Sequence, residues 1–294
     1  MRRQIVDGQE PVNRQANNAE PALIVVRHTS GWIPLKLKEL WEYRELIYFL
    51  AWRDLKVRYR QTILGVFWVM LQPLLMTLVF SLVFGRFAAI PASSSDIPYP
   101  IFALCGLLAW QFFSYVLANS TNSLVASERL ITKIYFPRLV IPLSGMLSGL
   151  VDFAIAFILL LVMMMYYRVA PTTNVWILPA FLVMIIAHAV GMGLWLAAMN
   201  LQYRDVRYVV PFISQLWFFT SPVVYPINFI PDNWRWLYAI NPMVGVIGGI
   251  RWSLFGSIAD LGLWLCASVS VAAVILVSGL YYFRRMERDF ADFV

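Results

Sequence analysis

The chain has 294 residues, of which 61% are hydrophobic and only 13% carry a formal charge. Soluble domains contain about 45–50% apolar and about 25% charged residues, so the composition excludes an ordinary soluble domain. The two cysteines, Cys105 and Cys266, lie in apolar stretches and indicate neither a disulfide framework nor a metal site. The formal net charge of +7 is interpreted below from its distribution along the chain.

The first 62 residues divide into two parts. Residues 1–30 are polar and show no sustained period, so we expect a polar N-terminal extension. Residues 31–62 are amphipathic, because apolar residues recur at spacings of three and four after Pro34. These are Leu37, Leu40, Tyr43, Ile47 and Leu50. The pattern predicts an amphipathic interfacial helix on the inner membrane surface, which either anchors the chain or helps to dock a cytosolic partner.

Residues 63–294 are expected to form a transmembrane domain of six helices. A helix needs about 20 apolar residues to cross a bilayer core of about 30 Å. Six stretches meet this length, and Asp152 is the one formally charged residue within them. They are residues 63–84, 101–122, 139–167, 175–201, 209–229 and 261–283. The predicted fold class is therefore an all-α integral membrane protein.

The positions of Lys and Arg set the orientation of these six helices. If both termini are cytoplasmic, the segments 1–62, 123–138, 202–208 and 284–294 carry 11, 3, 2 and 3 of them, or 19 of the 23. A seven-span alternative would move the three arginines after residue 283 to the outside, against the positive-inside rule. Six spans with cytoplasmic N and C termini are the better topology.

The same distribution argues against nucleic acid as a partner. Basic residues are densest just before the first span, at Arg53, Lys56, Arg58 and Arg60. Clusters beside a membrane contact anionic headgroups, at about 1 kcal/mol per residue near the surface. We therefore expect contact with anionic membrane lipids and no nucleic acid binding.

The cytoplasmic segment 127–138 mixes charged with large apolar residues. A plain connection would not need Leu130, Ile131 and Ile134 in water, and exposed apolar clusters rimmed by charge usually mark a protein contact. The alternative is that these side chains tuck back under the bilayer. The next cytoplasmic segment, 203–207, is short enough for a tight helical hairpin.

Polar and small residues inside the spans suggest how the helices pack. Asp152 and His188 each lie about 13 residues into antiparallel spans three and four, so we expect an intramembrane hydrogen bond between them, with proton coupling as the alternative. Gly145 and Gly149 form a small-xxx-small pair, which permits close helix contact within the subunit or at a dimer seam. Pro73 should loosen span one.

The external segment 230–260 contains a short apolar run in addition to the six long ones. Residues 243–250 are stopped by Arg251 and are too short to cross a bilayer, so we expect short re-entrant helices between spans five and six.

Five stretches stand out when they are taken in chain order. They are Trp52–Thr62 with Leu64-Gly65, Trp68 and Leu71–Leu74; Lys133–Arg138 with Pro142; Asn200 with Tyr203–Asp205; Ser221–Pro226; and Asn241–Met243. Together they resemble the permease subunits of ATP-binding-cassette (ABC) exporters of O-antigen, capsule or teichoic-acid polysaccharides. The resemblance covers about residues 35–285 and leaves the role of residues 1–30 open.

The resemblance implies a homodimer of this chain with two copies of a separate cytosolic ABC ATPase. No Gly-x-x-x-x-Gly-Lys-[Ser/Thr] phosphate loop occurs in the sequence, so we expect a non-enzymatic permease without a cofactor of its own, with ATP and Mg bound by the ATPase. In the family the N-terminal helix and the loop after span two contact that ATPase. The corresponding docking candidates are Leu40, Ile47, Glu128, Arg129, Ile131, Lys133, Tyr135, Phe136 and Arg138.

Export of a glycan would need a wide, hydrated path whose walls bind sugar weakly. Aromatic faces suit this role, although Trp and Tyr also gather at membrane interfaces. The candidate channel-lining aromatics are Phe67, Trp68, Trp110, Phe112, Phe113, Tyr115, Trp217, Phe218 and Phe219. The external segment resembles the outward gate of the family, and its candidates are Tyr225, Trp234, Asn241 and Pro242.

The leading function is export of a lipid-linked polysaccharide across the cytoplasmic membrane of a bacterium, driven by the partner ATPase. We expect residues 127–138 to carry the motion of the ATPase to spans one and five. A drug or small-lipid ABC exporter is the first alternative; it should lack the basic stretch 52–62. An ion-coupled flippase would call for more intramembrane ionisable residues than Asp152 and His188.

Overall fold

The structure is a computed structural model that describes residues 37–60, 65–87, 97–134, 136–256 and 261–287. These residues form helices, turns and irregular connections. The predicted N-terminal extension and Pro34 lie outside the described residues.

The predicted amphipathic helix is present as two helices. α1 spans Leu37–Glu42 and α2 spans Arg44–Arg60, with a turn at Tyr43 between them. α2 ends within the predicted amphipathic region 31–62 and carries the basic cluster on the helix itself. α2 packs mainly on α6, so part of its surface is covered by protein.

Among the described residues, five helical segments are long and apolar enough to cross a membrane. They are α3, Phe67–Phe80, continued by the π-helix η1, Ser81–Phe87; α4, Tyr99–Ala126; α6, Val140–Tyr166; η2, Thr173–Ile177, continued by α7, Leu178–Gln202; and α11, Leu261–Met286. Each coincides with one of the predicted spans to within a few residues.

The helix predicted at 209–229 is shorter than expected. α8 spans Val206–Phe219 and is only 14 residues long, which is about 21 Å at 1.5 Å per residue. Turns follow, and then the 3-10 helix η3 at Ile227–Phe229. Pro222 and Pro226 explain the early end, because proline supplies no backbone N–H and disfavours helix in the residue before it. The predicted tight hairpin between α7 and α8 is confirmed.

The segment between α8 and α11 contains short helices. They are η4, Asp232–Trp234; α9, Arg235–Ala239; and α10, Pro242–Phe255. Asn241 caps α10 by accepting a hydrogen bond from the Met243 backbone N–H at 3.0 Å, and Gly256 ends it with a φ of 71°. α10 is buried along almost its whole length, so it is part of the core.

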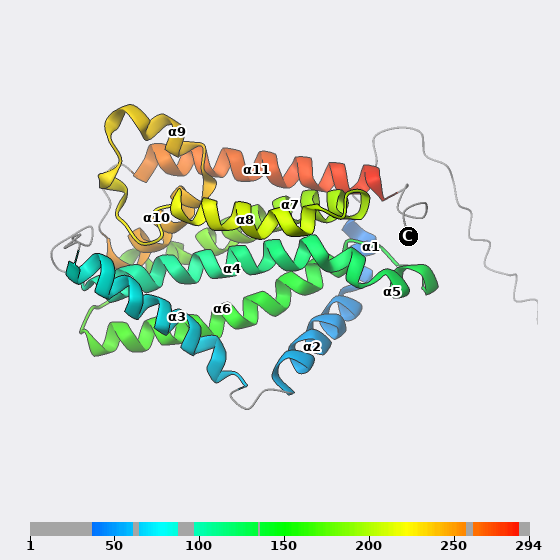
Figure 1. Cartoon of the computed structure of the whole chain (residues 1–294), viewed down its shortest axis with the longest axis horizontal. Helices are drawn as coiled ribbons and strands as arrows, with labels where there is room; N and C mark the ends of the chain where they lie inside the picture. The colour runs from blue at the N-terminus through cyan, green and yellow to red at the C-terminus, as the bar shows by residue number, and fades with distance from the viewer. Residues whose placement is uncertain (1–36, 61–64, 88–96, 135, 257–260, 288–294) are drawn as a thin grey trace, which may run out of the picture. The chain divides into compact units, whose positions relative to one another are not determined.

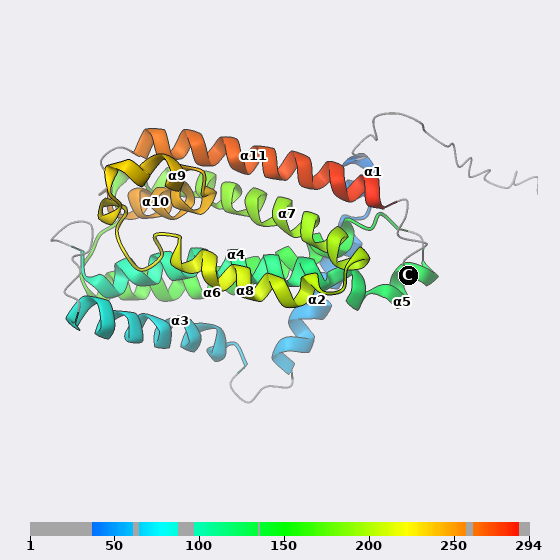
Figure 2. The ribbon, with the colours of Figure 1, turned by 45° about the horizontal axis from the view of Figure 1, so that its top comes forward.

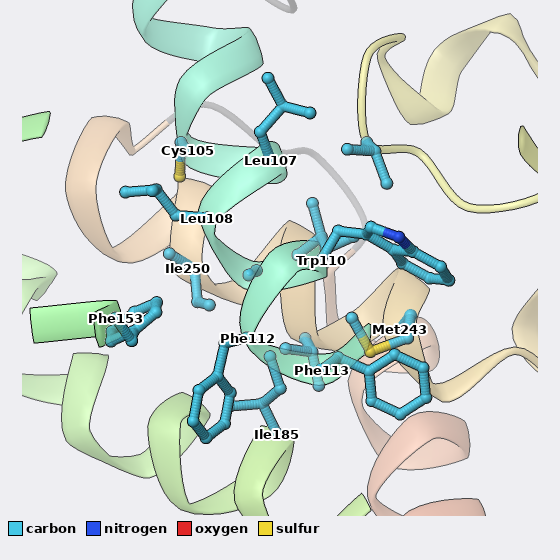
Figure 3. Close-up of a cluster of buried hydrophobic side chains, with 14 of the residues drawn as sticks. Cys105, Leu107, Leu108, Trp110, Phe112, Phe113, Phe153, Ile185, Met243 and Ile250 are labelled. Atoms are coloured by element: carbon cyan, nitrogen blue, oxygen red, sulfur yellow. The ribbon is translucent and has the colours of Figure 1, made fainter. Parts of the chain in front are cut away.

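The largest core surrounds α4, whose residues from Ile101 to Trp110 are all buried. α4 packs against α6 and α7 and also contacts α3, α8 and α10. Figure 3 shows its side chains leaving the helix in different directions, with Leu108 and Trp110 on opposite sides, and side chains of α6, α7 and α10 around them. Because α4 is enclosed in this way, it positions the surfaces described below.

A second cluster of buried side chains, here called the inner core, joins the ends of several helices. Leu50 of α2, Leu194 of α7 and Phe283 of α11 belong to it, together with Phe136 and Leu139 from the connection before α6. In both views α1, α5 (Glu128–Lys133) and the end of α11 lie toward one end of the bundle, and α9 and α10 lie toward the other (Figures 1 and 2).

Glycines permit the closest helix contacts. A Cβ placed on Gly149 of α6 would lie 2.5 Å from the Tyr115 ring of α4, so this small residue serves packing within the subunit. α7 and α11 approach more closely still, because a Cβ on Gly279 would lie 2.2 Å from the Gly191 carbonyl oxygen. Beside that contact the rings of Trp195 and Tyr282 stack at 4.2 Å.

Candidate functional site

Asp152 and His188 do not form the predicted hydrogen bond. The Asp152 carboxylate accepts hydrogen bonds from Arg58 and Tyr59 of α2. His188 is fully buried, with its ring stacked on Phe113 at a centroid distance of 4.9 Å, and neither ring nitrogen has a hydrogen-bond partner among the described residues. The prediction was wrong because it assumed that a polar group in one span pairs with its neighbouring span, whereas the partner of Asp152 comes from outside the spans.

Arg58 is the centre of a polar cluster that joins three helices. Besides Asp152 of α6, its guanidinium donates to the hydroxyl of Tyr115 on α4 and lies 4.6 Å from the centroid of that ring. The Tyr115 hydroxyl also lies 3.2 Å from Ser148 Oγ. Burial acts to lower the pKa of Arg58, but the hydrogen bond to Tyr115 and the charge of Asp152 outweigh it and raise that pKa. Arg58 therefore stays charged, and its contacts with Asp152 and Tyr115 fix α2 against α4 and α6.

Breaking this ion pair on one side is expected to destabilise the protein. Asp152→Asn leaves the guanidinium half-buried without its counter-charge, and Arg58→Gln does the same to the carboxylate. We expect each variant to lose about 1–2 kcal/mol and the double variant to lose less than the sum, since the side chain of Arg58 keeps 34% of its exposure. Thermal unfolding in detergent of the wild type and the three variants measures the coupling; strictly additive losses would contradict it.

Two open cavities lie along the exposed side of α4. The first groove, of about 480 Å³, lies between α3, α4 and α6 and reaches Arg58. The second groove, of about 390 Å³, lies between α3, α4 and α8. Both have the size of small-molecule sites. They share five lining residues, so they meet beneath α3: Gln72, Trp110, Gln111, Ser114 and Ala118.

Most of the predicted channel aromatics lie at these grooves. Trp68, Phe112 and Tyr115 line the first, Phe218 and Phe219 line the second, and Trp110 lines both. Phe67 is 54% exposed beside them on α3.

Two of the predicted channel aromatics lie elsewhere. Phe113 is fully buried between His188 and Trp217 and lines neither groove. Trp217 lines neither groove and donates its indole N–H to Asn241 Oδ1 at 3.0 Å.

Two of the four predicted gate residues, Tyr225 and Asn241, make side-chain hydrogen bonds at the other end of the bundle from α5. Tyr225 hydrogen-bonds to Tyr238 of α9, and burial raises the pKa of the Tyr238 phenol, so it stays neutral at physiological pH. Asn241 donates to Ser221 Oγ at 2.9 Å. Pro242 is buried and Trp234 is 60% exposed. Residues 243–250 of α10 are all buried, so deleting them would disrupt the core and could not test the gate separately.

The structural role of Arg251 was not predicted from the sequence. Its side chain is 4% exposed and donates to the backbone oxygens of Pro222, Val223 and Phe102 at 2.6, 2.5 and 3.0 Å. Burial lowers its pKa to about 10, so it is charged at neutral pH. Within the described part of the chain it makes no ion pair. The signal was present in the sequence as one arginine inside an apolar run.

The docking candidates divide between surface and core. Glu128, Arg129 and Lys133 of α5 are exposed, while Leu40, Ile47 and Ile131 are partly buried against the inner core. Tyr135 lies outside the described residues.

Phe136 and Arg138 are held within the fold. Phe136 is only 5% exposed and belongs to the inner core, so it offers little surface to a partner. Arg138 donates its backbone N–H to Glu287 Oε1 at 3.2 Å and its guanidinium to the Glu287 backbone oxygen at 2.7 Å. The connection before α6 is thereby fastened to the end of α11.

Comparison with known proteins places these features in context. Residues 45–255 match the family model of the ABC-2 type transporter. The O-antigen export system permease protein RfbA of Myxococcus xanthus is 31% identical over 87% of this chain and 98% of its own length. The protein of the same name from Klebsiella pneumoniae is 27% identical over 84% and 94%. The polysialic acid transport protein KpsM of Escherichia coli is 25% identical over 80% and 91%.

Proposed function

The chain belongs to the ABC-2 type transporter family, and on this premise we propose that it is the membrane subunit of an ATP-driven polysaccharide exporter. The observation that carries the proposal is the similarity, over nearly the full length of the relatives, to proteins named for export of O-antigen and transport of polysialic acid. The chain is a multi-pass protein of the bacterial inner membrane, and ATP hydrolysis belongs to a separate subunit. The substrate would be a lipid-linked glycan of the O-antigen, capsule or teichoic-acid type.

The topology within this proposal has six crossings with both termini in the cytoplasm. Five crossings correspond to the five long apolar segments. α8 makes the sixth together with the turns at 220–226, which bring the chain to the end of the bundle where α9 and α10 lie (Figure 1). Irregular backbone at membrane depth is tolerated where protein encloses it, and residues 221–224 are buried.

In the proposed assembly two copies of the chain meet along α3 and α8, and two ATPase subunits bind on their cytoplasmic side. The grooves with their aromatic side chains would then face a channel between the copies. The contacts of Tyr225 with Tyr238 and of Asn241 with Ser221 would close that channel on the outside while no polymer is engaged. α10 would serve as the fixed wall of this gate, because it is buried.

ATP binding would act on the channel through the inner core. Residues 128–133 would receive the motion of the ATPase, and Phe136 and Arg138 would pass it to the inner core and to α11. Sequence alone favoured a direct path to spans one and five. The contacts of Phe136 and Arg138 instead support a path through the inner core and α2, and the Arg58–Asp152 pair then links α2 to the wall of the first groove.

Deleting the gene in its native host is expected to abolish surface display of one polysaccharide while its lipid-linked precursor accumulates in the cytoplasm. The proposed function requires this, because the membrane subunit provides the sole path for the polymer. Immunoblotting of whole and lysed cells for the glycan measures both pools, and the wild-type gene on a plasmid should restore display. Normal display in the deletion strain, with loss of a drug or lipid efflux activity, would favour the small-molecule exporter.

The exposed face of α5 is expected to bind the ATPase. Reversing two of its charges, in Arg129→Glu with Lys133→Glu, should reduce co-purified ATPase about tenfold, which corresponds to about 1.4 kcal/mol. Arg168→Glu, in the connection after α6, is the matched control and should retain the partner. Equal recovery from both variants would place the docking surface elsewhere. Phe136→Ala is not a suitable test, since loss of a buried ring weakens the fold itself.

A further inference from the structure

Three glutamine side chains converge on the two grooves from three different helices. Gln72 of α3 and Gln111 of α4 line both grooves, and Gln215 of α8 lines the second. Ser114 and Ser214 lie between them, with hydroxyl oxygens 3.1 Å apart. Neutral polar groups therefore follow the grooves through a part of the chain where the surrounding helix surfaces are apolar.

The three amides make no hydrogen bonds that stabilise the described part of the fold. Within the part of the chain that the structure describes, none of them takes part in a hydrogen bond, and Gln72 and Gln215 are exposed. An amide transferred to hydrocarbon without a partner costs several kcal/mol. Polar residues in spans accordingly face protein or a water-filled cavity. The grooves are therefore expected to hold water or a polar ligand in place of acyl chains.

The chemistry of the grooves selects among polar ligands. An amide both donates and accepts hydrogen bonds, as a sugar hydroxyl does. Because the amide is neutral, it does not favour a charged ligand. The charged groups at the first groove, Arg58 and Asp152, neutralise each other. Trp68 is 54% exposed and lines the first groove together with Gln72 and Gln111, and its ring suits the C–H faces of pyranose rings. A neutral carbohydrate meets all three features, whereas an acyl chain would leave the amides without partners.

We propose that Gln72, Gln111 and Gln215 form a hydrogen-bonding track for the sugar hydroxyls of the exported glycan, with the aromatic rings of the grooves as its stacking surface. This inference rests on the proposed function and assigns the substrate contacts to named residues. The track binds a neutral stretch of the polymer and does not recognise the terminus of the polymer or its lipid carrier.

Replacing each glutamine by methionine tests the track, because methionine keeps the length and flexibility of the side chain and removes its hydrogen bonds. Each variant should reduce the rate at which the glycan reaches the surface about fivefold, the value of one net hydrogen bond. Gln202→Met, at the exposed end of α7, is the matched control and should export normally. Rates are compared at equal amounts of permease in the membrane.

The outcomes separate this inference from the function on which it rests. If the wild-type gene does not restore surface glycan to the deletion strain, the proposed function fails. If the wild-type gene restores it and all three methionine variants match it, the function stands and the track is wrong.

Cysteine labelling of the intact permease–ATPase complex gives a second measurement that does not depend on export. In a Cys266→Ser background, Gln72→Cys should react about tenfold faster with a charged, membrane-impermeant thiol reagent than Leu78→Cys, because the thiolate forms only in water. Leu78 lies on the same helix, is 58% exposed and lines neither groove. Equal reaction rates would overturn the track, since lipid would then fill the groove.

Discussion

Replacing Arg251 by methionine is expected to lower the free energy of unfolding by about 4 kcal/mol. The guanidinium donates to three backbone oxygens, those of Phe102 in α4 and of Pro222 and Val223 in the turn after α8. It also lies 3.5 Å from the centroid of the Phe102 ring. Hydrogen bonds to a charged group contribute about 1.5–3 kcal/mol each, and each buried oxygen left without a donor adds a penalty. Methionine fills much of the space but donates nothing.

Thermal unfolding of the purified protein in detergent measures this effect. Arg86→Met is the matched control, because Arg86 is exposed at the end of η1, and it should leave the transition unchanged. Arg251→Lys should fall between the two, since an ammonium group cannot reach three oxygens with the planar geometry of a guanidinium. An Arg251→Met protein as stable as the control would contradict the role assigned to these hydrogen bonds.

Leucine at Gly279 is expected to destabilise the protein by about 3 kcal/mol or more. The first side-chain atom alone would lie 2.2 Å from the Gly191 carbonyl oxygen, which is backbone and cannot rotate away. α7 and α11 would have to separate, and the stacked rings of Trp195 and Tyr282 would separate with them. Alanine should show the same effect at a smaller size.

Gly262→Leu is the control within the same helix, because no atom lies within 4 Å of the position of its Cβ. The two leucine variants add the same side chain to α11, so they differ only in what that side chain meets. The amount of folded protein recovered from membranes and its apparent melting temperature should fall for Gly279→Leu alone. Similar losses in both variants would contradict the role assigned to the contact with Gly191, because leucine forms helix more readily than glycine and helix propensity alone causes no loss.

The arrangement of helices could be largely predicted from the sequence, because long apolar runs and their flanking charges carry that information locally. The positions of α4, α6, α7 and α11 follow from length and hydrophobicity alone. α8 was predicted too long because the apolar run continues past Phe219, whereas the helix ends there. The prolines at 222 and 226 carried the signal, and their effect on the backbone outweighs hydropathy.

The side-chain pairings could not be predicted in the same way. Arg58 and Asp152 are 94 residues apart, and no local pattern connects them. The sequence suggested His188 as the partner because both residues lie at the same depth in neighbouring spans, but depth does not specify the face of a helix. Phe136 looked exposed because it follows a charged helix. Its burial depends on helices that begin or end nearby in space.

Arg251 also bears on the order in which the chain assembles. A guanidinium without partners is costly inside a membrane, so α10 can settle only after its acceptors are in place. Phe102, Pro222 and Val223 all precede Arg251 in the chain, and synthesis at about 5–20 residues per second delivers them first. A circular permutation that placed α10 ahead of α4 would keep every native contact, yet it would expose this charge during insertion and slow the maturation of the protein.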